Sequence, residues 1–329
     1  MSLPPILEGN LRIPVIGAPM FIVSGPELVI AQCKAGIVGS FPALNARPAE
    51  VLDEWLARIT TELEEYKAAN PDKPVAPYAV NQIVHRSNAR LQRDLDICVK
   101  HEVPIMITSL GAREEVNAAA HSYGGITLHD IINNRFANKA IEKGADGLIA
   151  VAAGAGGHAG TLSPFALIQE IREWFDGPLL LSGSIAKGDS ILAAQAMGAD
   201  LAYIGSAFIA TEEANAVDGY KEMITESGGD DIVYTNLFTG VHGNYLKGAV
   251  RNAGMDPDNL ETSDASAMNF GGGTSKPKKW KDIWGAGQGV GAVKSIPKAA
   301  ELIDRLEREY LAARERLGLS SGSSRAAAE

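Results

Sequence analysis

The chain has 329 residues, of which 46% are hydrophobic and 21% charged, a composition typical of soluble globular proteins. This length suits one large domain or two ordinary ones. The formal net charge of −10 argues against nonspecific binding of nucleic acid, which depends on dense lysine and arginine. The two cysteines, Cys33 and Cys98, lie in helix-like segments, so we expect buried, reduced thiols rather than a disulfide framework.

No apolar run approaches the roughly 20 residues that a membrane-spanning helix needs. Residues 1–30 contain no basic segment followed by an apolar one, the pattern of a secretory leader. We therefore expect a cytoplasmic protein with no nucleic-acid or membrane partner. The tail 320–329 carries neither core residues nor a motif, and we interpret it as a disordered, appended remnant outside the fold.

Short apolar segments alternate with amphipathic ones along the chain, as in proteins built from βαβ units. The apolar segments, predicted to be strands, are Ile13–Pro19, Ile37–Pro42, Val75–Val80, Pro104–Ser109, Gly125–His129, Gly147–Ala153, Pro178–Ser182 and Leu201–Gly205. The amphipathic segments, predicted to be helices, are Glu27–Lys34, Ala49–Ala68, Ala89–His101, Glu114–Ala120, Asn134–Lys143, Pro164–Phe175, Ser190–Met197 and, last in the chain, Pro297–Leu317.

Eight such units predict an α/β fold of the (β/α)8 TIM-barrel type. An open, doubly wound sheet is the competing architecture, but the unbroken alternation through eight units favours the barrel. We expect the barrel over 1–211, a mainly helical cap or lid inserted after strand eight at 212–281, and a return to the barrel with a C-terminal helix at 282–319. The cap is expected over the C-terminal face, because long insertions in compact proteins commonly serve as lids.

The end of the sixth predicted strand carries the stretch Gly154-Ala-Gly-Gly-His-Ala-Gly160. Its glycines, Gly157 among them, let backbone approach a ligand closely. His158 is the only side chain there that carries a proton near neutral pH. A lone histidine is more often structural, but barrel enzymes place their chemistry at strand ends, so we predict a catalytic role for His158. The glycines match a dinucleotide fingerprint only weakly, since no acidic residue closes the next strand.

Glycine and serine also follow strands seven and eight, as Ser182-Gly183-Ser184 and Gly205-Ser206. In barrels these two loops commonly bind phosphate through backbone N–H groups and helix N-termini. Ordinary tight turns favour the same residues, but their occurrence in both expected units favours phosphate. Neither loop holds a lysine or a carboxylate for Mg²⁺, which suits a permanently bound phosphate ester better than a transferred phosphoryl group.

Other sequence features argue against two kinds of site and add two residues that would contact a ligand. The remaining histidines lack the spacing of metal ligands, so we expect no metal site, and no Gly-x-Ser-x-Gly elbow supports a serine hydrolase. Asn81-Gln82 closes the third strand and would present an amide to a planar heterocycle, although asparagine there is as often a turn residue. Gln288, in the glycine-rich segment 283–291, would reach a ligand if that segment folds back over the barrel mouth.

These features together resemble the nitronate monooxygenase (2-nitropropane dioxygenase-like) flavoproteins, which are FMN enzymes on a (β/α)8 barrel with a smaller helical domain. The resemblance extends over about 13–317. It rests on Pro14–Met20, Asn81–Gln82, Gly156–Gly160, Ser182–Ser184, Gly205–Phe208 and Trp284–Gln288.

The resemblance implies a position for FMN. The backbone of Ala18, Pro19 and Met20 would lie along the isoalloxazine ring, with Asn81 near its polar edge. The segments Ser182–Ser184 and Gly205–Ser206 would hold the FMN phosphate. His158 would face the substrate beside the reactive flavin N5.

Three positions depart from the family pattern. Many relatives carry Met-Gln-Gly or Met-Ala-Gly where this chain has Met20-Phe21-Ile22. Many carry a lysine where Asp130 follows His129, and a glycine is common at the position of Ser184. Because of these departures, the resemblance does not identify the substrate.

Our leading hypothesis is an FMN-dependent oxidoreductase that uses O2 to oxidise alkyl nitronates, and nitroalkanes, to carbonyl compounds and nitrite. Protonated His158 would hold the nitronate oxygens, and neutral His158 would remove the α-proton of a nitroalkane. An NADH-dependent FMN reductase of quinones or enoyl thioesters is the alternative, although no convincing nicotinamide site is present. A flavin-free lyase or isomerase is disfavoured by the shortage of Lys, Asp and Glu at strand ends. The cap could carry a homodimer contact.

Overall fold

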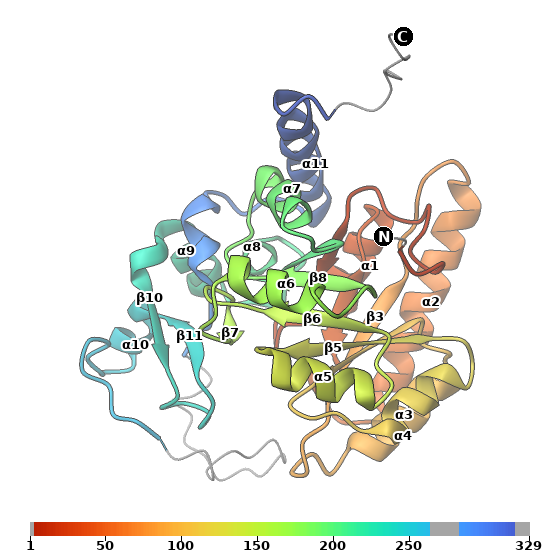
Figure 1. Ribbon diagram of the computed structural model, residues 1–329, viewed down its shortest axis with the longest axis horizontal. Helices are drawn as coiled ribbons and strands as arrows, with labels where there is room; N and C mark the ends of the chain where they lie inside the picture. Colours follow the sequence, from red (N-terminus) through yellow and green to blue (C-terminus); the bar gives the residue numbers. More distant parts are fainter. Residues whose placement is uncertain (1–2, 264–282, 320–329) are drawn as a thin grey trace.

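The computed structural model describes residues 3–263 and 283–319 (Figure 1). The tail 320–329 and part of the predicted cap, 264–281, lie outside the described residues. The larger of two sheets has eight strands: β1 (Val15–Gly17), β2 (Gly39–Pro42), β3 (Tyr78–Ile83), β4 (Ile105–Ser109), β5 (Ile126–Ile131), β6 (Gly147–Val151), β8 (Leu179–Ser182) and β9 (Leu201–Ile204). Each corresponds to one predicted strand.

The eight strands form a closed parallel barrel. Their order is β1-β9-β8-β6-β5-β4-β3-β2, and every pairing in this sheet is parallel. The two end strands meet at a parallel bridge between Ile16 and Val38, where Gly17 N donates to the Val38 carbonyl at 2.8 Å. The predicted (β/α)8 barrel is therefore confirmed, and the open sheet is not formed.

Helices cover the outside of the barrel between successive strands (Figure 1). They are α1 (Pro26–Lys34), α2 (Val51–Ala69), α3 (Leu91–Lys100), α4 (Glu114–His121), α5 (Asn134–Glu142), α6 (Pro164–Arg172), α7 (Gly188–Ala196) and the short α8 (Ser206–Ile209), with the 3₁₀ turn η1 (Ala43–Asn45) after β2. The last helix, α11 (Ala299–Arg316), packs against α7 and α1. All predicted helices have a counterpart.

The alternation of side chains along each strand gives the barrel an apolar interior, with a more polar layer at the C-terminal ends of the strands. Side chains two residues apart on a strand point to the same face. One interior layer holds Ile16, Val38, Ala79, Ile107, Leu128, Ile149, Leu180 and Leu201, all buried in one cluster. Two residues further along each strand, at the C-terminal end, the inward positions are Ala18, Ser40, Asn81, Ser109, Asp130, Val151, Ser182 and Tyr203. The polar members of this layer make the C-terminal end the natural place for a ligand.

The inserted segment builds a smaller unit on one side of the barrel, away from α2 to α4 (Figure 1). Its described elements are α9 (Asp218–Glu226), η2 (Gly229–Asp231), β10 (Ile232–Thr235), β11 (Gly243–Leu246) and α10 (Lys247–Asn252). Strand β11 pairs antiparallel with β10 and with β7 (Gly157–His158). A mainly helical cap and a loop at 157–158 were expected from the sequence, and this three-stranded sheet was not predicted.

The segment after the undescribed residues joins the cap to the barrel. Leu246 N donates to the Trp284 carbonyl at 2.9 Å, and Tyr245 forms a bridge with Gly285. The Trp284 ring stacks on Tyr220 of α9, with 5.0 Å between the ring centroids. The 3₁₀ helix η5 (Gln288–Ala292) follows. This segment thus fixes the cap against the barrel mouth.

Two further expectations can be compared with the structure. Cys33 and Cys98 are buried and free, as expected, and burial raises the pKa of each thiol to about 12. Within 3–263 and 283–319, no helix is both long and apolar enough to cross a membrane.

An ion pair at the N-terminal ends of β8 and β9 ties α6 to the barrel. Arg172 Nη2 lies 2.6 Å from Asp200 Oδ2, with the side chains 13% and 9% exposed. The other guanidinium nitrogens donate to the carbonyls of Phe175, Gly177 and Gly198 at 2.7–3.0 Å. Asp200 also accepts from Leu179 N, the first residue of β8. One arginine therefore satisfies a nearly buried carboxylate and three carbonyl groups.

We predict that Arg172→Met lowers the free energy of unfolding by about 3 kcal/mol, because it leaves the Asp200 carboxylate buried without its partner. Urea denaturation monitored by circular dichroism measures this loss. As a control, Lys143→Met removes an exposed pair with Glu114 and should leave the midpoint nearly unchanged. Equal midpoints for the two variants would contradict the role given to Arg172.

Candidate active site

The loops after β1 and β9 lie side by side at the C-terminal end of the barrel. A Cβ atom placed on Gly205 would be 3.4 Å from Ala18 Cβ and 3.7 Å from Met20 Sδ, which is ordinary contact. Ala18 N also donates to the carbonyl of Ile204 at 2.8 Å. The predicted segments Ala18–Met20, with Pro19 at its centre, and Gly205–Ser206 are thus brought together.

The loops after β6 and β8 meet at Gly154, where they also contact the segment 283–292, here called the returning segment. The Gly154 carbonyl accepts from Gln288 N at 2.9 Å and from Ser184 N at 3.3 Å. Gly154 has φ +84°, and a Cβ there would be 2.2 Å from Ser184 Oγ. Here the absence of a side chain lets protein loops approach one another rather than a ligand. A Cβ on Gly157, in contrast, would have no described heavy atom within 4 Å, so this glycine borders open space.

Ser206 connects the same returning segment to the β9 loop. Gly287 N donates to Ser206 Oγ at 2.8 Å, and a Cβ on Gly156 would be 3.1 Å from the same oxygen. Because the hydroxyl oxygen accepts from the backbone, its proton remains to be donated to another group. Ser206 is therefore a hydrogen-bond donor suited to an anion at the mouth.

Asn81 belongs to a hydrogen-bonded row across β3, β4 and β5. Its Nδ2 donates to Ser109 Oγ at 2.7 Å and to the Ile107 carbonyl at 3.2 Å. Ser109 Oγ in turn donates to Asp130 Oδ2 at 2.5 Å. The neighbouring Gln82 points outward and donates to Cys98 Sγ of α3 at 3.3 Å. Of the pair Asn81-Gln82, only Asn81 faces the barrel interior.

His158 lies on β7, between the barrel and the cap. Its ring nitrogen Nε2 is 2.9 Å from Thr239 Oγ1, and Thr239 donates its hydroxyl proton to the Val241 carbonyl at 2.9 Å. With the Thr239 proton on Val241, Nε2 is the donor to Thr239, and we infer that Nδ1 is the basic nitrogen of the neutral ring. Burial lowers the pKa of His158 to about 4. The ring is therefore neutral at pH 7, which disfavours the protonated role considered from the sequence.

Two of the departures from the family pattern occupy left-handed backbone. Ile22 has φ 67° and Ser184 has φ 57°, a region that glycine adopts without strain. The resemblance noted from the sequence implies glycine at these positions in many relatives. The chain thus keeps a glycine-type backbone with other side chains, and Ile22, a β-branched residue, bears the greater strain.

Asn45 of η1 holds the strained loop in place. Its Oδ1 accepts from Ile22 N at 2.9 Å, and its Nδ2 donates to the carbonyls of Met20 and Ser24 at 2.9 and 2.8 Å. Asn215 Nδ2 adds a bond to the Ile22 carbonyl at 3.0 Å. One amide side chain thereby positions the backbone on both sides of Phe21.

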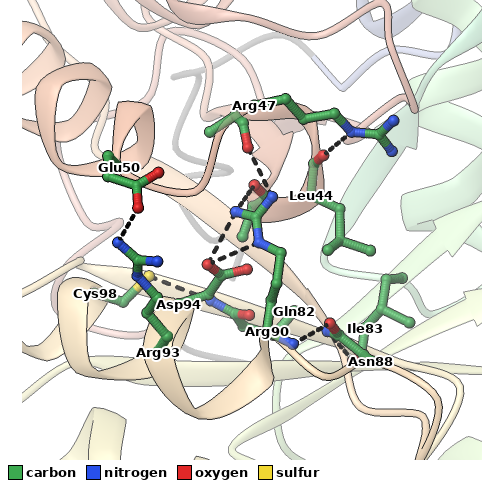
Figure 2. Close-up of polar contacts among 12 residues, drawn as sticks. Leu44, Arg47, Glu50, Gln82, Ile83, Asn88, Arg90, Arg93, Asp94 and Cys98 are labelled. Atoms are coloured by element: carbon green, nitrogen blue, oxygen red, sulfur yellow. Dashed lines mark hydrogen bonds and ion pairs between the residues drawn. The ribbon is translucent and has the colours of Figure 1, made fainter. Parts of the chain in front are cut away.

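Arg90 in turn holds η1 from behind (Figure 2). Its guanidinium donates to the Ala46 carbonyl at 2.8 Å and to the Ala43 carbonyl at 3.3 Å. The same group is paired with Asp94 Oδ1 at 2.9 Å, and the Asp94 side chain is fully buried. A chain of contacts therefore runs from α3 through η1 to the loop that carries Met20.

An open groove of about 750 Å³ adjoins this loop. Phe21 and Trp55 line it, and the Arg47 guanidinium lies 5.3 Å from the centre of the Phe21 ring. Of the predicted site residues none lines this groove, so we place the candidate site at the barrel mouth beside it.

The structure adds four residues that were not assigned from the sequence: Ser109, Asp130, Tyr203 and Thr239. The first three are inward-facing residues at the C-terminal ends of strands. The alternation of inward and outward side chains along each predicted strand would have identified them. Thr239 has no such signal, because its place depends on the pairing of β11 with β7. The assigned roles of His158 and of the loop residues remain predictions.

Comparison with known proteins extends these observations. The family model described as "Nitronate monooxygenase" matches residues 7–309. A nitronate monooxygenase of Paraburkholderia phytofirmans is 27% identical, over 92% of this chain and 94% of that protein. The structure of a nitroalkane oxidase from Streptomyces ansochromogenes has a TM-score of 0.80 at 24% identity, covering 95% of this chain and 99% of that one.

The same fold occurs in a protein named for a different activity. The enoyl reductase domain of MlnA, from the macrolactin biosynthesis cluster of Bacillus amyloliquefaciens, has a TM-score of 0.69 at 16% identity, covering 97% of this chain and 99% of that one. At such identities both structural likenesses show the fold alone.

We predict that Gly154→Ala destabilises the protein more than Gly157→Ala. Both residues have positive φ, so each alanine costs about 1–2 kcal/mol of backbone strain. Only at Gly154 does the added methyl group also collide with Ser184 Oγ. Thermal unfolding of the two variants measures the difference, and equal losses would contradict the close contact between the β6 and β8 loops.

Proposed function

Because the chain belongs to the nitronate monooxygenase family, we propose that it binds FMN at the barrel mouth and uses O2 to oxidise alkyl nitronates to carbonyl compounds and nitrite. As a member of this family it is an oxidoreductase of the flavoprotein type. The observation that carries the proposal is the convergence, at one end of the barrel, of Ala18–Met20, Ser182–Ser184, Gly205–Ser206 and Gln288 around the loop 154–158.

The residues at the mouth fit a flavin phosphate ester. Ser206 retains a hydroxyl proton to donate, and the adjacent Gly205 adds no side chain that would fill the space above Ala18 and Met20. Ser182 and Gly183 follow β8, the strand beside β9 in the barrel. In the proposed complex these two neighbouring loops hold the phosphate through hydroxyl and backbone N–H groups.

The ring system would lie over the polar inward layer. Asn81 offers an amide there, and Asp130 Oδ1 is a buried oxygen with no hydrogen-bond partner in the described residues. Such an atom is costly unless a ligand satisfies it. When bound, FMN would accept the electrons released by substrate oxidation and pass them to O2.

His158 is uncharged at pH 7, so it is available as a proton acceptor rather than as an anion-binding cation. In the proposed site Nε2 carries the proton and donates to Thr239, and the low pKa keeps the ring neutral at pH 7. In the proposed reaction Nδ1 removes the α-proton of a neutral nitroalkane. A nitronate has already lost this proton, so His158 would then serve to orient it through a neutral ring.

The spectrum of the purified protein tests the cofactor and the substrate. We expect a flavin spectrum that bleaches anaerobically on addition of an alkyl nitronate but not of NADH. Bleaching by NADH with no response to the nitronate would instead support a reductase of quinones or enoyl thioesters. A colourless protein that takes up no FMN would overturn the proposal and favour a flavin-free barrel enzyme.

The role of His158 is tested by comparing two substrates. We predict that His158→Ala lowers kcat/KM for a neutral nitroalkane by about 10²-fold or more, the usual contribution of a general base, with FMN still bound. The loss for the preformed nitronate should be much smaller. His121→Ala, which removes an exposed histidine paired with Asp146, serves as a control and should leave both values unchanged. Equal losses for the two substrates would contradict proton abstraction by His158.

A further inference from the structure

Asp130 has an unusual environment for a carboxyl group. It occupies the inward position at the C-terminal end of β5, in the polar layer of the mouth. Its Oδ2 accepts a hydrogen bond from Ser109, but Oδ1 is inaccessible to solvent and has no partner among the described residues. Buried polar atoms in folded proteins nearly always have a partner. An unpartnered oxygen at the mouth of a barrel therefore indicates a ligand.

The direction of the hydrogen bonds shows which oxygen would meet that ligand. Asn81 Nδ2 donates to Ser109 Oγ, and Ser109 donates its only proton to Asp130 Oδ2. Oδ2 is thus occupied as an acceptor. When the carboxyl group is protonated, Oδ1 is the oxygen that carries the proton and can donate it.

The surroundings favour the neutral acid. Burial raises the pKa of Asp130 to about 6, and the Ser109 hydroxyl acts in the opposite direction. Tyr203 faces it from β9, and its own pKa is raised well above the usual value, so it stays uncharged. On the outer face of β5, His129 is bonded to Thr108 and its pKa is lowered to about 4. No cation among the described residues compensates a negative charge on Asp130.

We propose that Asp130 binds the flavin ring of FMN as a neutral carboxylic acid, donating a hydrogen bond from Oδ1 to an acceptor on the ring's polar edge. The proposal rests on the FMN site proposed above. The polar edge of the flavin ring carries the acceptors N1, N5 and two carbonyl oxygens against a single donor, N3–H, and FMN adds a negatively charged phosphate. A donor therefore suits it better than a second anion. Binding to ionised Asp130 takes up one proton from water, which forms the Oδ1–H bond.

This arrangement couples FMN affinity to pH. If the complex contains only protonated Asp130, its pKa is higher with FMN than without, and binding weakens as the pH rises through the pKa of the free protein. The limit is about tenfold in Kd for each pH unit by which the two pKa values differ. The FMN phosphate titrates near pH 6 as well, so the informative quantity is the ratio of wild-type Kd to variant Kd at each pH.

The experiment compares Asp130→Asn with wild type. The apoprotein is titrated with FMN from pH 5 to pH 8, and quenching of FMN fluorescence gives Kd. Asparagine donates an N–H at every pH, so the ratio of wild-type Kd to variant Kd should be near one at pH 5 and rise about tenfold or more by pH 8. The control Asp146→Asn changes an aspartate at the opposite end of the barrel, bonded to Thr127 N, and its ratio should not depend on pH.

A constant ratio for Asp130→Asn would overturn the proposal. A second variant, Ser109→Ala, keeps it testable if the asparagine variant does not fold. Loss of the Ser109 hydroxyl removes the bond that lowers the pKa of Asp130, so the fall in affinity should move to higher pH; an unmoved pH profile would overturn the proposal. If the wild-type protein binds no FMN at any pH, the FMN site itself is refuted. If it binds FMN normally but the ratio of wild-type Kd to variant Kd does not depend on pH, only the role of Asp130 is refuted.

Discussion

Closure of the parallel sheet between β1 and β2 is the constraint on which the site depends. The backbone bonds at Gly17 and Val38 join the ends of the sheet, so that all eight strands point the same way around one axis. Every loop that follows a strand then emerges on the same rim. Residues as distant in the chain as Ala18 and Gly205 become neighbours because β1 and β9 are adjacent in the closed order. The bridge between Ile16 and Val38 closes the ring on the other side of β1.

A second level of organisation is the contact between loops. The Gly154 carbonyl accepts hydrogen bonds from the backbone N–H groups of Ser184 and Gln288, and Ser206 Oγ accepts one from Gly287 N. These bonds fix the rim before any ligand binds, and the glycines are needed for that close approach. The cap is attached to the same place, since β11 pairs with β7 and Asn244 donates to the Ala155 carbonyl at 2.6 Å. The loop 154–158 is therefore the junction of barrel, cap and returning segment.

The sequence predicts the barrel well because its signal is local. Apolar strands and amphipathic helices repeat with distinct periods, and the ends of strands can be read directly from glycine and serine. The small sheet of the cap could not be predicted in this way. Strand β7 has only two residues, and nothing in Gly157-His158 indicates pairing until β11 lies beside it. Thr239 and the His158 tautomer depend on that pairing. Asp130 was visible as a departure from relatives, but its significance depends on Ser109 of the paired strand β4 and on Tyr203 of β9.

Burial has the same consequence for the acid and the base of the mouth: it favours the uncharged form of each. The pKa of His158 falls to about 4 and that of Asp130 rises to about 6 for this one reason. A neutral histidine accepts a proton, and a neutral carboxyl group donates a hydrogen bond. At pH 7 His158 is uncharged, whereas Asp130 is still largely ionised and becomes neutral only by taking up a proton in the proposed complex. An anionic substrate would be drawn there by hydroxyl and N–H groups such as that of Ser206, whose strength grows as water is excluded.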